Sequence, residues 1–306
     1  MSRAEDTAGT IERMLAIKAL PLFADVHPDE LAIVAEHAQV RTFRRGETLV
    51  PSIHLVLEGR LTEHRGGQPF RTHGPQQVVG GIDALALTPA EVTVVADEDT
   101  TTLAIERADL RDILEDNFGV LSATLQGVAA AVLRLRRRLV PSAGFAERGV
   151  PDREAPAPLD ELGARIVFLR ALPWLGQGSI ETLGQIAREA TLVSLADGEP
   201  LWRERDPADH VMLVVGGVVV CATADDRQRF EGAPRAILGL EEALAIEPRW
   251  YGAVARGSVS LLRITQAAIV DALEDDPDTA LYALGSLASV ASRLRDRVAR
   301  MTTEAP

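Results

Sequence analysis

The histidines are the side chains of this chain with the widest choice of chemistry, because imidazole binds metals and transfers protons near neutral pH. The six histidines are His27, His37, His54, His64, His73 and His210. No two of them have the HxH or HExxH spacing that zinc sites and metalloproteases use. We therefore expect them to be solvated or to cap helices, and we expect no metal site.

The sequence also lacks the common motifs for nucleophilic catalysis and for phosphate binding. The sequence has no Gly-x-Ser-x-Gly elbow, no Walker loop and no Gly-x-Gly-x-x-Gly segment after a strand. The single cysteine, Cys221, follows the apolar run 218–220 and is expected to be a small buried hydrophobe. These observations argue against an enzyme and exclude an internal disulfide.

Arginines gather near the end of two helical patterns. They are Arg134, Arg136, Arg137 and Arg138, and then Arg293, Arg295, Arg297 and Arg300. Such a run can bind nucleic acid, but at a helix C-terminus it also complements the macrodipole and keeps an apolar helix soluble. The net charge of -13 repels phosphate backbones, so we expect no nucleic-acid partner.

The length of 306 residues favours two domains of ordinary size. Apolar residues make up 46% and charged residues 25%, which allows both a packed core and a soluble surface. Residues 1–6 lack the basic and apolar regions of a signal peptide, and no apolar stretch approaches the ~20 residues of a membrane span. The sequence therefore predicts a cytoplasmic protein without a membrane partner.

The elements that must position any site occur twice. Residues 19–23 (ALPLF) recur 152 positions later as residues 171–175 (ALPWL). Further along, a shift of 159 pairs Leu114–Asp116 with Leu273–Asp275. The first copy is thus seven residues shorter, and most of the difference falls just after Leu49. Self-similarity at one register indicates a duplicated domain.

Each copy has the same order of patterns. A helical segment comes first, then short apolar runs broken by glycine turns, among which Gly66–Gly67 and Gly216–Gly217 are predicted hairpins, and then a long amphipathic helix. We predict an α+β protein with two tandem antiparallel β-roll (jelly-roll-like) domains, each flanked by helices and closed by a long amphipathic C-terminal helix. The predicted domains are 14–139 and 161–301, joined by a Pro-rich linker at 140–160.

The closing helices carry regular apolar stripes. These are Leu125, Val128, Val132, Leu135 and Leu139 in the first copy, and Leu284, Leu287, Ala291, Leu294 and Val298 in the second. Each stripe must be buried against something. We favour a homodimer through the long helices, while pairing within one chain, or with another protein, stays open.

The second copy also contains a specific string. Residues 197–201 (DGEPL) and 206–217 (DPADHVMLVVGG) are similar to the "GE…GDPADHLYVVLSG" stretch of the cyclic-nucleotide-binding domain found in catabolite activators and kinase regulatory subunits. The chain resembles two such domains in tandem. The resemblance implies a phosphate-binding cassette ("FGELALL…PRxATV") in which backbone N–H groups and an arginine hold the cyclic phosphate, and a glutamate accepts a hydrogen bond from the ribose.

Both cassettes depart from that pattern. The first has Gly81 at the glutamate position and Ala90 at the arginine position, so we expect it not to bind a cyclic nucleotide. The second has Leu240 in place of the glutamate but keeps the arginine as Arg249. Its candidate ligand-binding residues are Gly239, Glu241, Arg249 and Trp250.

Purely structural roles compete with these assignments of ligand-binding residues. Glu241–Glu242 is more simply a solvated acidic pair at a helix start, and an exposed ion pair for Arg249 is as plausible as a ligand contact. Transcription regulators of the family that this chain resembles carry a helix-turn-helix after the long helix. We expect none here, because no room for one remains before Pro306. We therefore predict a non-catalytic regulatory or assembly protein with degenerate domains; the alternative is a receptor for cAMP or cGMP in the second domain only.

Overall fold

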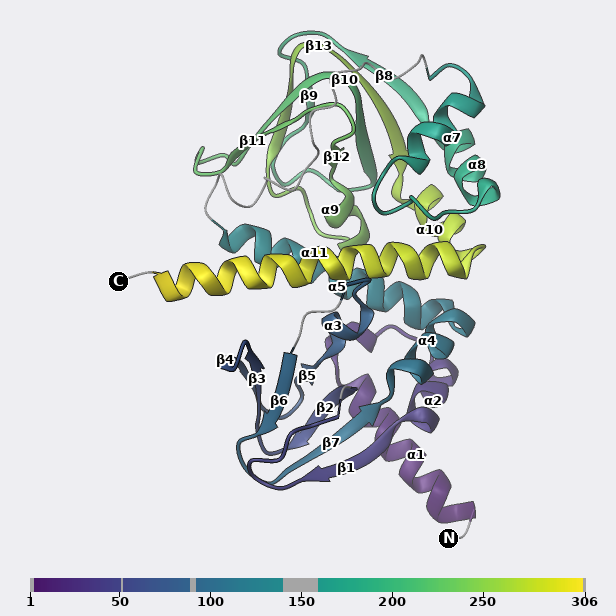
Figure 1. Ribbon diagram of the computed structural model, residues 1–306. Helices are drawn as coiled ribbons and strands as arrows, with labels where there is room; N and C mark the ends of the chain where they lie inside the picture. The colour runs from purple at the N-terminus through teal and green to yellow at the C-terminus, as the bar shows by residue number, and fades with distance from the viewer. Residues whose placement is uncertain (1–2, 51, 89–91, 140–158, 305–306) are drawn as a thin grey trace. The chain divides into compact units, whose positions relative to one another are not determined.

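The computed structural model describes residues 3–50, 52–88, 92–139 and 159–304, and its chain divides into two compact units at residues 124 and 125 (Figure 1). The predicted linker 140–160 lies outside the described residues except for its last two positions. The domain bounds 14–139 and 161–301 stay predictions.

The first unit is a β-roll preceded by helices. Its elements are α1 (Arg3–Lys18), the 3-10 helix η1 (Pro21–Phe23), α2 (Pro28–His37), β1 (Gln39–Phe43), β2 (Ile53–Glu58), β3 (Leu61–Arg65), β4 (Gln68–His73), β5 (Val78–Val79), α3 (Gly81–Leu85), β6 (Val92–Ala96), β7 (Thr100–Ile105), α4 (Arg107–Asp116) and the start of α5 (Phe118–Arg138). The strands form one sheet in the order β1-β7-β2-β5 and another in the order β4-β3-β6. All pairs are antiparallel.

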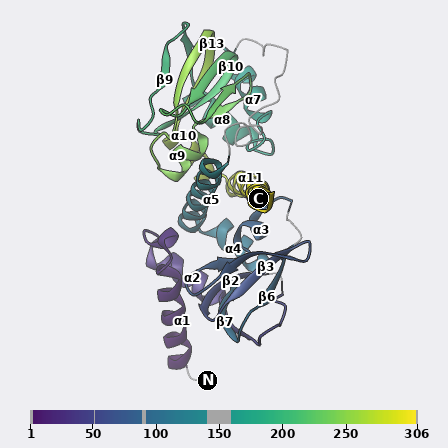
Figure 2. The ribbon, with the colours of Figure 1, turned by 90° about the vertical axis from the view of Figure 1, so that its left-hand side faces the viewer.

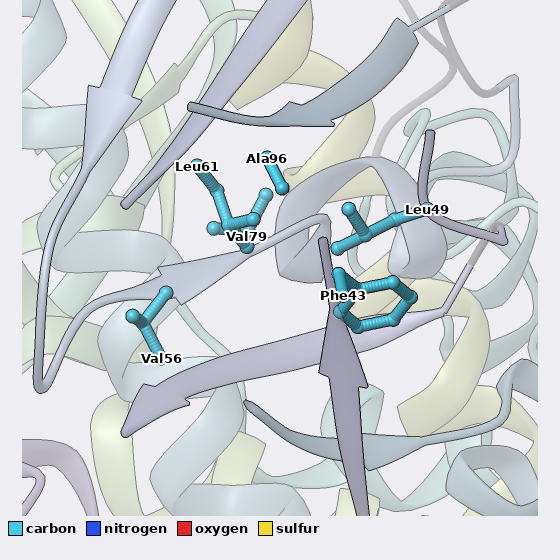
Figure 3. Packing of buried hydrophobic residues seen from close by; sticks show 6 residues of the cluster. All are labelled: Phe43, Leu49, Val56, Leu61, Val79 and Ala96. Carbon is cyan, nitrogen blue, oxygen red and sulfur yellow. The ribbon is translucent and has the colours of Figure 1, made fainter. Parts of the chain in front are cut away.

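The core of the first roll lies between its two sheets. Figure 3 shows its apolar cluster, which consists of Phe43, Leu49, Val56, Leu61, Val79 and Ala96. These residues come from five strands and from the segment after β1, so their burial joins the two sheets. Gly66 and Gly67 connect β3 to β4 with positive φ angles, which confirms the predicted hairpin.

The second unit repeats this plan with longer strands. After the second half of α5 come α7 (Leu162–Arg170), α8 (Ile180–Glu189), β8 (Thr191–Leu195), β9 (Pro200–Trp202), β10 (His210–Ala222), β11 (Arg229–Gly232), β12 (Ile237–Leu238), α9 (Leu240–Ala245), β13 (Gly252–Thr265), α10 (Gln266–Glu274) and α11 (Pro277–Glu304). The strand order is β11-β10-β13-β8, with β12 on β10 and β9 on β13. Figure 2 shows β10 and β13 side by side as the longest pair.

Gly216–Gly217 is not a hairpin, and that prediction is wrong. Both glycines lie in the middle of β10, where the register with β13 shifts. Gly217 has φ of +82°, and a Cβ there would lie 2.4 Å from the carbonyl oxygen of Ser258. Glycine is required because the two backbones approach closely at a bulge, which sequence spacing cannot distinguish from a turn.

The predicted fold class is confirmed: the chain is an α+β protein with two antiparallel β-rolls and long closing helices. The stripe residues on α5 and α11 are buried or half-buried within a single chain. A second copy is therefore not required to remove the stripes from water, and the homodimer stays a prediction.

Helix α5 corrects one expectation about membranes. Among the described residues, it alone is long and apolar enough to span a bilayer by length and composition. The core helix of a soluble protein meets the same criterion. Several of its apolar side chains, Val128 and Val132 among them, are buried within the protein.

Asp276 precedes α11 and caps it. Burial alone would raise the pKa of the Asp276 carboxyl, but hydrogen bonds from the Thr182 hydroxyl (2.5 Å) and from the Thr279 N–H and hydroxyl (3.0 and 2.7 Å) outweigh burial and lower the pKa to about 2. The carboxylate therefore stabilises the fold above its unfolded pKa of 3.8, and this contribution is lost as the pH falls from about 4 to about 2.

We predict that Asp276→Ala lowers the free energy of unfolding by about 1 kcal/mol at neutral pH, as expected for loss of a cap. The difference between the variant and the wild type should shrink as the pH falls from about 4 to about 2, because the Asp276 carboxyl of the unfolded chain is protonated over this range while that of the folded chain is still ionised. Urea unfolding from pH 2 to 7 measures this, with Glu274→Ala, an exposed acid of α10, as the control. A difference that is constant with pH would contradict the assignment.

Candidate functional site

The second cassette is formed by β12, α9 and the segment that leads into β13. β12 pairs with β10 through Leu238 and Met212, which fixes where the cassette begins. Gly239 then adopts a left-handed conformation with φ of +80°, which turns the chain into α9. Ile246 ends that helix, also in a left-handed conformation. The short helix is thus held between two sharp backbone turns.

Arg249 lies inside the protein, with 1% of its surface exposed. Its Nη1 donates a hydrogen bond to the carbonyl oxygen of Gly239 at 3.1 Å, and its Nη2 donates to the carbonyl oxygen of His210. The guanidinium carbon stacks 4.1 Å from the centre of the Trp202 ring. Arg249 is therefore not in an exposed ion pair, and that interpretation is wrong.

The segment that only the second copy carries holds the backbone of Arg249. The Arg249 N–H donates to the carbonyl oxygen of Asp206 at 2.9 Å, and its own carbonyl accepts from the Arg205 N–H at 2.7 Å. Both partners belong to the stretch 203–209, which follows β9. The extra residues thus place this arginine by hydrogen bonds that do not depend on its side chain.

The Trp202 ring that stacks on Arg249 belongs to an aromatic cluster. The Tyr251 ring is fully buried and lies 5.7 Å from Trp202, 5.0 Å from Phe230 and 5.4 Å from Trp250, measured between ring centres. The indole N–H of Trp202 donates to the carbonyl oxygen of Tyr251 at 3.1 Å. Trp250, a predicted site residue, thus packs on Tyr251, whereas it is Trp202 that stacks on Arg249.

The electrostatic surroundings of Arg249 are mixed. Burial lowers the pKa of its guanidinium, and the negative charge of Glu242 opposes that shift. Glu242 is itself fully buried. Burial also lowers the pKa of His210, while its hydrogen bond to Asp209 acts the other way. Arg249 thus has a carboxylate among the groups that already balance its charge.

The acidic pair at the start of α9 is not solvated, which corrects the sequence expectation. Glu241 and Glu242 are both buried. One carboxylate oxygen of Glu241 accepts from Nε and Nη2 of Arg136, at 3.1 and 3.0 Å. The interpretation of the arginine run as a solvated helix end is therefore wrong at Arg136, because this side chain neutralises a carboxylate 105 residues away.

The first cassette is built differently. Gly81 begins α3 at the position of the family's glutamate, and Asp83 on the same helix pairs with Arg65 of β3 at 3.2 Å. Ala90, at the position of the family's arginine, lies outside the described residues. Arg65 comes from a strand of the roll and is stacked 4.5 Å from the centre of the Phe70 ring. The sequence does not mark this pair, because its partners share no motif.

Two histidines of the first roll correct the expectation of solvated imidazoles. His54 and His73 are almost completely buried. His54 lies within hydrogen-bonding distance of the Thr102 hydroxyl and the Val50 carbonyl oxygen, and burial lowers its pKa. His73 lies 3.5 Å from Glu63. His27, by contrast, accepts from the Asp29 N–H and caps α2 as expected.

The second cassette contains charged side chains that are buried, whereas metal-ligating groups are not gathered in the described residues. No group of three or more His, Cys, Asp or Glu side chains in this part of the chain is placed to hold a metal ion. Cys221 is buried, as predicted. The second cassette contributes the buried Arg249, Glu241 and Glu242, and Trp202 of β9 stacks on the guanidinium of Arg249.

Several solved structures are similar to the chain. The regulatory domain of Toxoplasma gondii PKA with cAMP is 13% identical; the match covers 100% of this chain and 99% of that one, with a TM-score of 0.34. The regulatory subunit of a cAMP-independent protein kinase A from Trypanosoma brucei is 15% identical over 90% of each chain, with a TM-score of 0.33. The sensor domain of the transcriptional regulator DNR from Pseudomonas aeruginosa is 22% identical over 43% of this chain and 94% of that one, with a TM-score of 0.38.

The family comparison identifies the chain. No curated protein sequence matches it. The family model described as "Cyclic nucleotide-binding domain" matches residues 38–117 and again residues 192–276, which together make up more than half of the sequence. Each match begins at the first strand of a roll and ends at the helices that follow its last strand. The chain therefore belongs to the cyclic nucleotide-binding domain family and carries two such domains in tandem.

Proposed function

We propose that this chain is a non-catalytic regulatory or assembly protein whose two domains do not hold a cyclic nucleotide in the manner of their family. The observation that carries the proposal is the side chain of Arg249. Its guanidinium donates to the carbonyl oxygens of Gly239 and His210 and stacks on Trp202. The arginine at the family's phosphate position is thus engaged by its own domain.

The energetics of phosphate entry support this interpretation. An anionic phosphate must exchange its water for donors and a counter-charge. To serve as that counter-charge through Nη1 and Nη2, Arg249 would withdraw its N–H groups from the carbonyl oxygens of Gly239 and His210. The Gly239 carbonyl also accepts from the Ala243 N–H at 3.1 Å, so the cost of roughly 1–3 kcal/mol arises mainly at His210. Glu242, buried close enough to influence Arg249, adds repulsion. Both effects make the binding of an anionic phosphate at Arg249 less favourable.

The first domain supports the proposal by its charges. Its cassette helix contributes Asp83, which pairs with Arg65, and has glycine where the family has glutamate. Arg65 is therefore already neutralised in part by a carboxylate of the helix that would face a phosphate. A ligand of negative charge would compete with Asp83 for this arginine.

Calorimetry with cyclic AMP and cyclic GMP tests the proposal. The full chain is titrated with each nucleotide to millimolar concentration, and no saturable heat is expected. Saturable binding at micromolar concentration would contradict the proposal and favour the second candidate function.

That second candidate is a cyclic-nucleotide receptor that uses only the second domain. It is favoured by the position of Arg249, whose Nη1 contacts the Gly239 carbonyl at the start of α9. Its ligand-binding residues would be Gly239, Glu241, Arg249 and Trp250. If heat is observed, Arg249→Ala should weaken binding by about 1.5–3 kcal/mol, whereas the exposed Arg203→Ala should leave affinity unchanged.

The remaining expectations belong to the same proposal. A regulatory module acts through a partner, which would be a second copy joined through the long helices or another protein. We place the protein in the cytoplasm. We expect neither DNA nor a membrane as its partner, because its net charge of -13 repels both.

A further inference from the structure

The second half of α5 contacts the second cassette at several points. Besides the pair of Arg136 with Glu241, Arg137 pairs with Glu247 at 2.8 Å. The Gln126 side chain donates to the carbonyl oxygen of Ala245, the last residue of α9, at 3.4 Å. Both segments belong to the same compact unit, although the sequence repeat assigns α5 to the first copy.

The two ion pairs differ in their exposure. The side chains of Arg136 and Glu241 are 4% and 9% exposed, and two N–H groups converge on one oxygen. Those of Arg137 and Glu247 are 38% and 31% exposed. Removing one partner of a buried ion pair strongly destabilises the fold, because the other charge is left buried without compensation. An exposed ion pair contributes little to stability and is screened by salt. Arg136 therefore carries most of the attachment.

The second domain also forms hydrogen bonds with the C-terminal end of α5. The Gln228 side chain, just before β11, donates to the carbonyl oxygens of Arg137 and Leu139, both at 3.4 Å. These carbonyls lie at a helix C-terminus, where the helix itself offers no donor. The second domain thus binds both the side chains and the terminal backbone of this helix.

We propose that residues 125–139 of α5 form a built-in cover of the second cassette, held chiefly by Arg136 on Glu241. Glu241 follows directly after the position where the family carries its ribose-binding glutamate. Any ligand or partner that uses this carboxylate must first displace Arg136. This cover of α9 does not depend on whether the second domain can bind a cyclic nucleotide.

Hydrogen–deuterium exchange of the full chain tests the cover. Arg136→Gln removes the positive charge beside Glu241, so amides of residues 239–246 and 130–139 should exchange at least ~10-fold faster, while amides of β10 and β13 stay unchanged. The matched control is Arg134→Gln, an exposed arginine of the same helix, which should alter neither segment.

A second variant distinguishes the cover from general loosening of the fold. Glu241→Gln alone should accelerate exchange in α5, and the double variant Arg136→Gln with Glu241→Gln should exchange more slowly than either single variant, because neither charge is then left behind. Unchanged exchange of residues 239–246 in Arg136→Gln would overturn the proposal. So would single effects that simply add in the double variant.

Discussion

Arg249→Ala is expected to lower the free energy of unfolding of the second domain by about 3–5 kcal/mol, without any ligand present. The change withdraws donors from two carbonyl oxygens, those of Gly239 and His210, and removes the cation stacked on Trp202. It also removes a positive charge that opposes the buried Glu242. Arg249, although it lies at the family's phosphate position, would thus contribute mainly to the stability of the second domain.

Urea unfolding followed by tryptophan fluorescence measures this effect, since Trp202 and Trp250 both lie beside the cassette. The control is Arg203→Ala, an exposed arginine on the neighbouring loop, which should stay within about 0.5 kcal/mol of wild type. A loss below about 1 kcal/mol for Arg249→Ala would show that its guanidinium is not engaged as described.

Gly239→Ala should be nearly as damaging, by about 3–5 kcal/mol. A Cβ at this position would lie 1.8 Å from Nη1 of Arg249. A guanidinium is ordinarily able to move aside, but this one is fixed by its hydrogen bonds and by the Trp202 ring. The methyl group would displace the arginine, in addition to straining a backbone with φ of +80°.

Gly198→Ala is the matched control for backbone strain. Gly198 has the same φ of +80°, but nothing lies within 4 Å of its Cβ position, so only the left-handed strain of about 1–2 kcal/mol is expected. Introducing Gly239→Ala into the Arg249→Ala variant should likewise cost only that strain. Equal losses for Gly239→Ala and Gly198→Ala would contradict a steric role for the arginine.

Much of the fold was predictable from local patterns. The duplication, the glycine-separated apolar runs and the apolar stripes on the closing helices indicated two β-rolls, and the structure confirms them. Alternation and helical spacing are properties of neighbouring residues, so a single sequence displays them. The hairpin at Gly216–Gly217 was the exception, because a bulge and a turn use the same residue for different reasons.

The candidate site was predictable only in part. The sequence by itself determined that the second cassette has a glycine at 239 and an arginine at 249, and the first cassette has no glutamate at 81. Those are matters of residue identity at a repeated register. They indicate which groups are present, and they leave open which partners those groups contact.

The tertiary structure alone decided how these groups are used. Glu241 is neutralised by Arg136, far away along the chain, and Arg249 donates to the carbonyl oxygen of His210 on another strand. His73 is buried beside Glu63, across a pair of strands. Whether a charged side chain is solvated or buried depends on the partners that folding brings to it, because burial is tolerated only where another group balances the charge. No local pattern in the sequence records that balance.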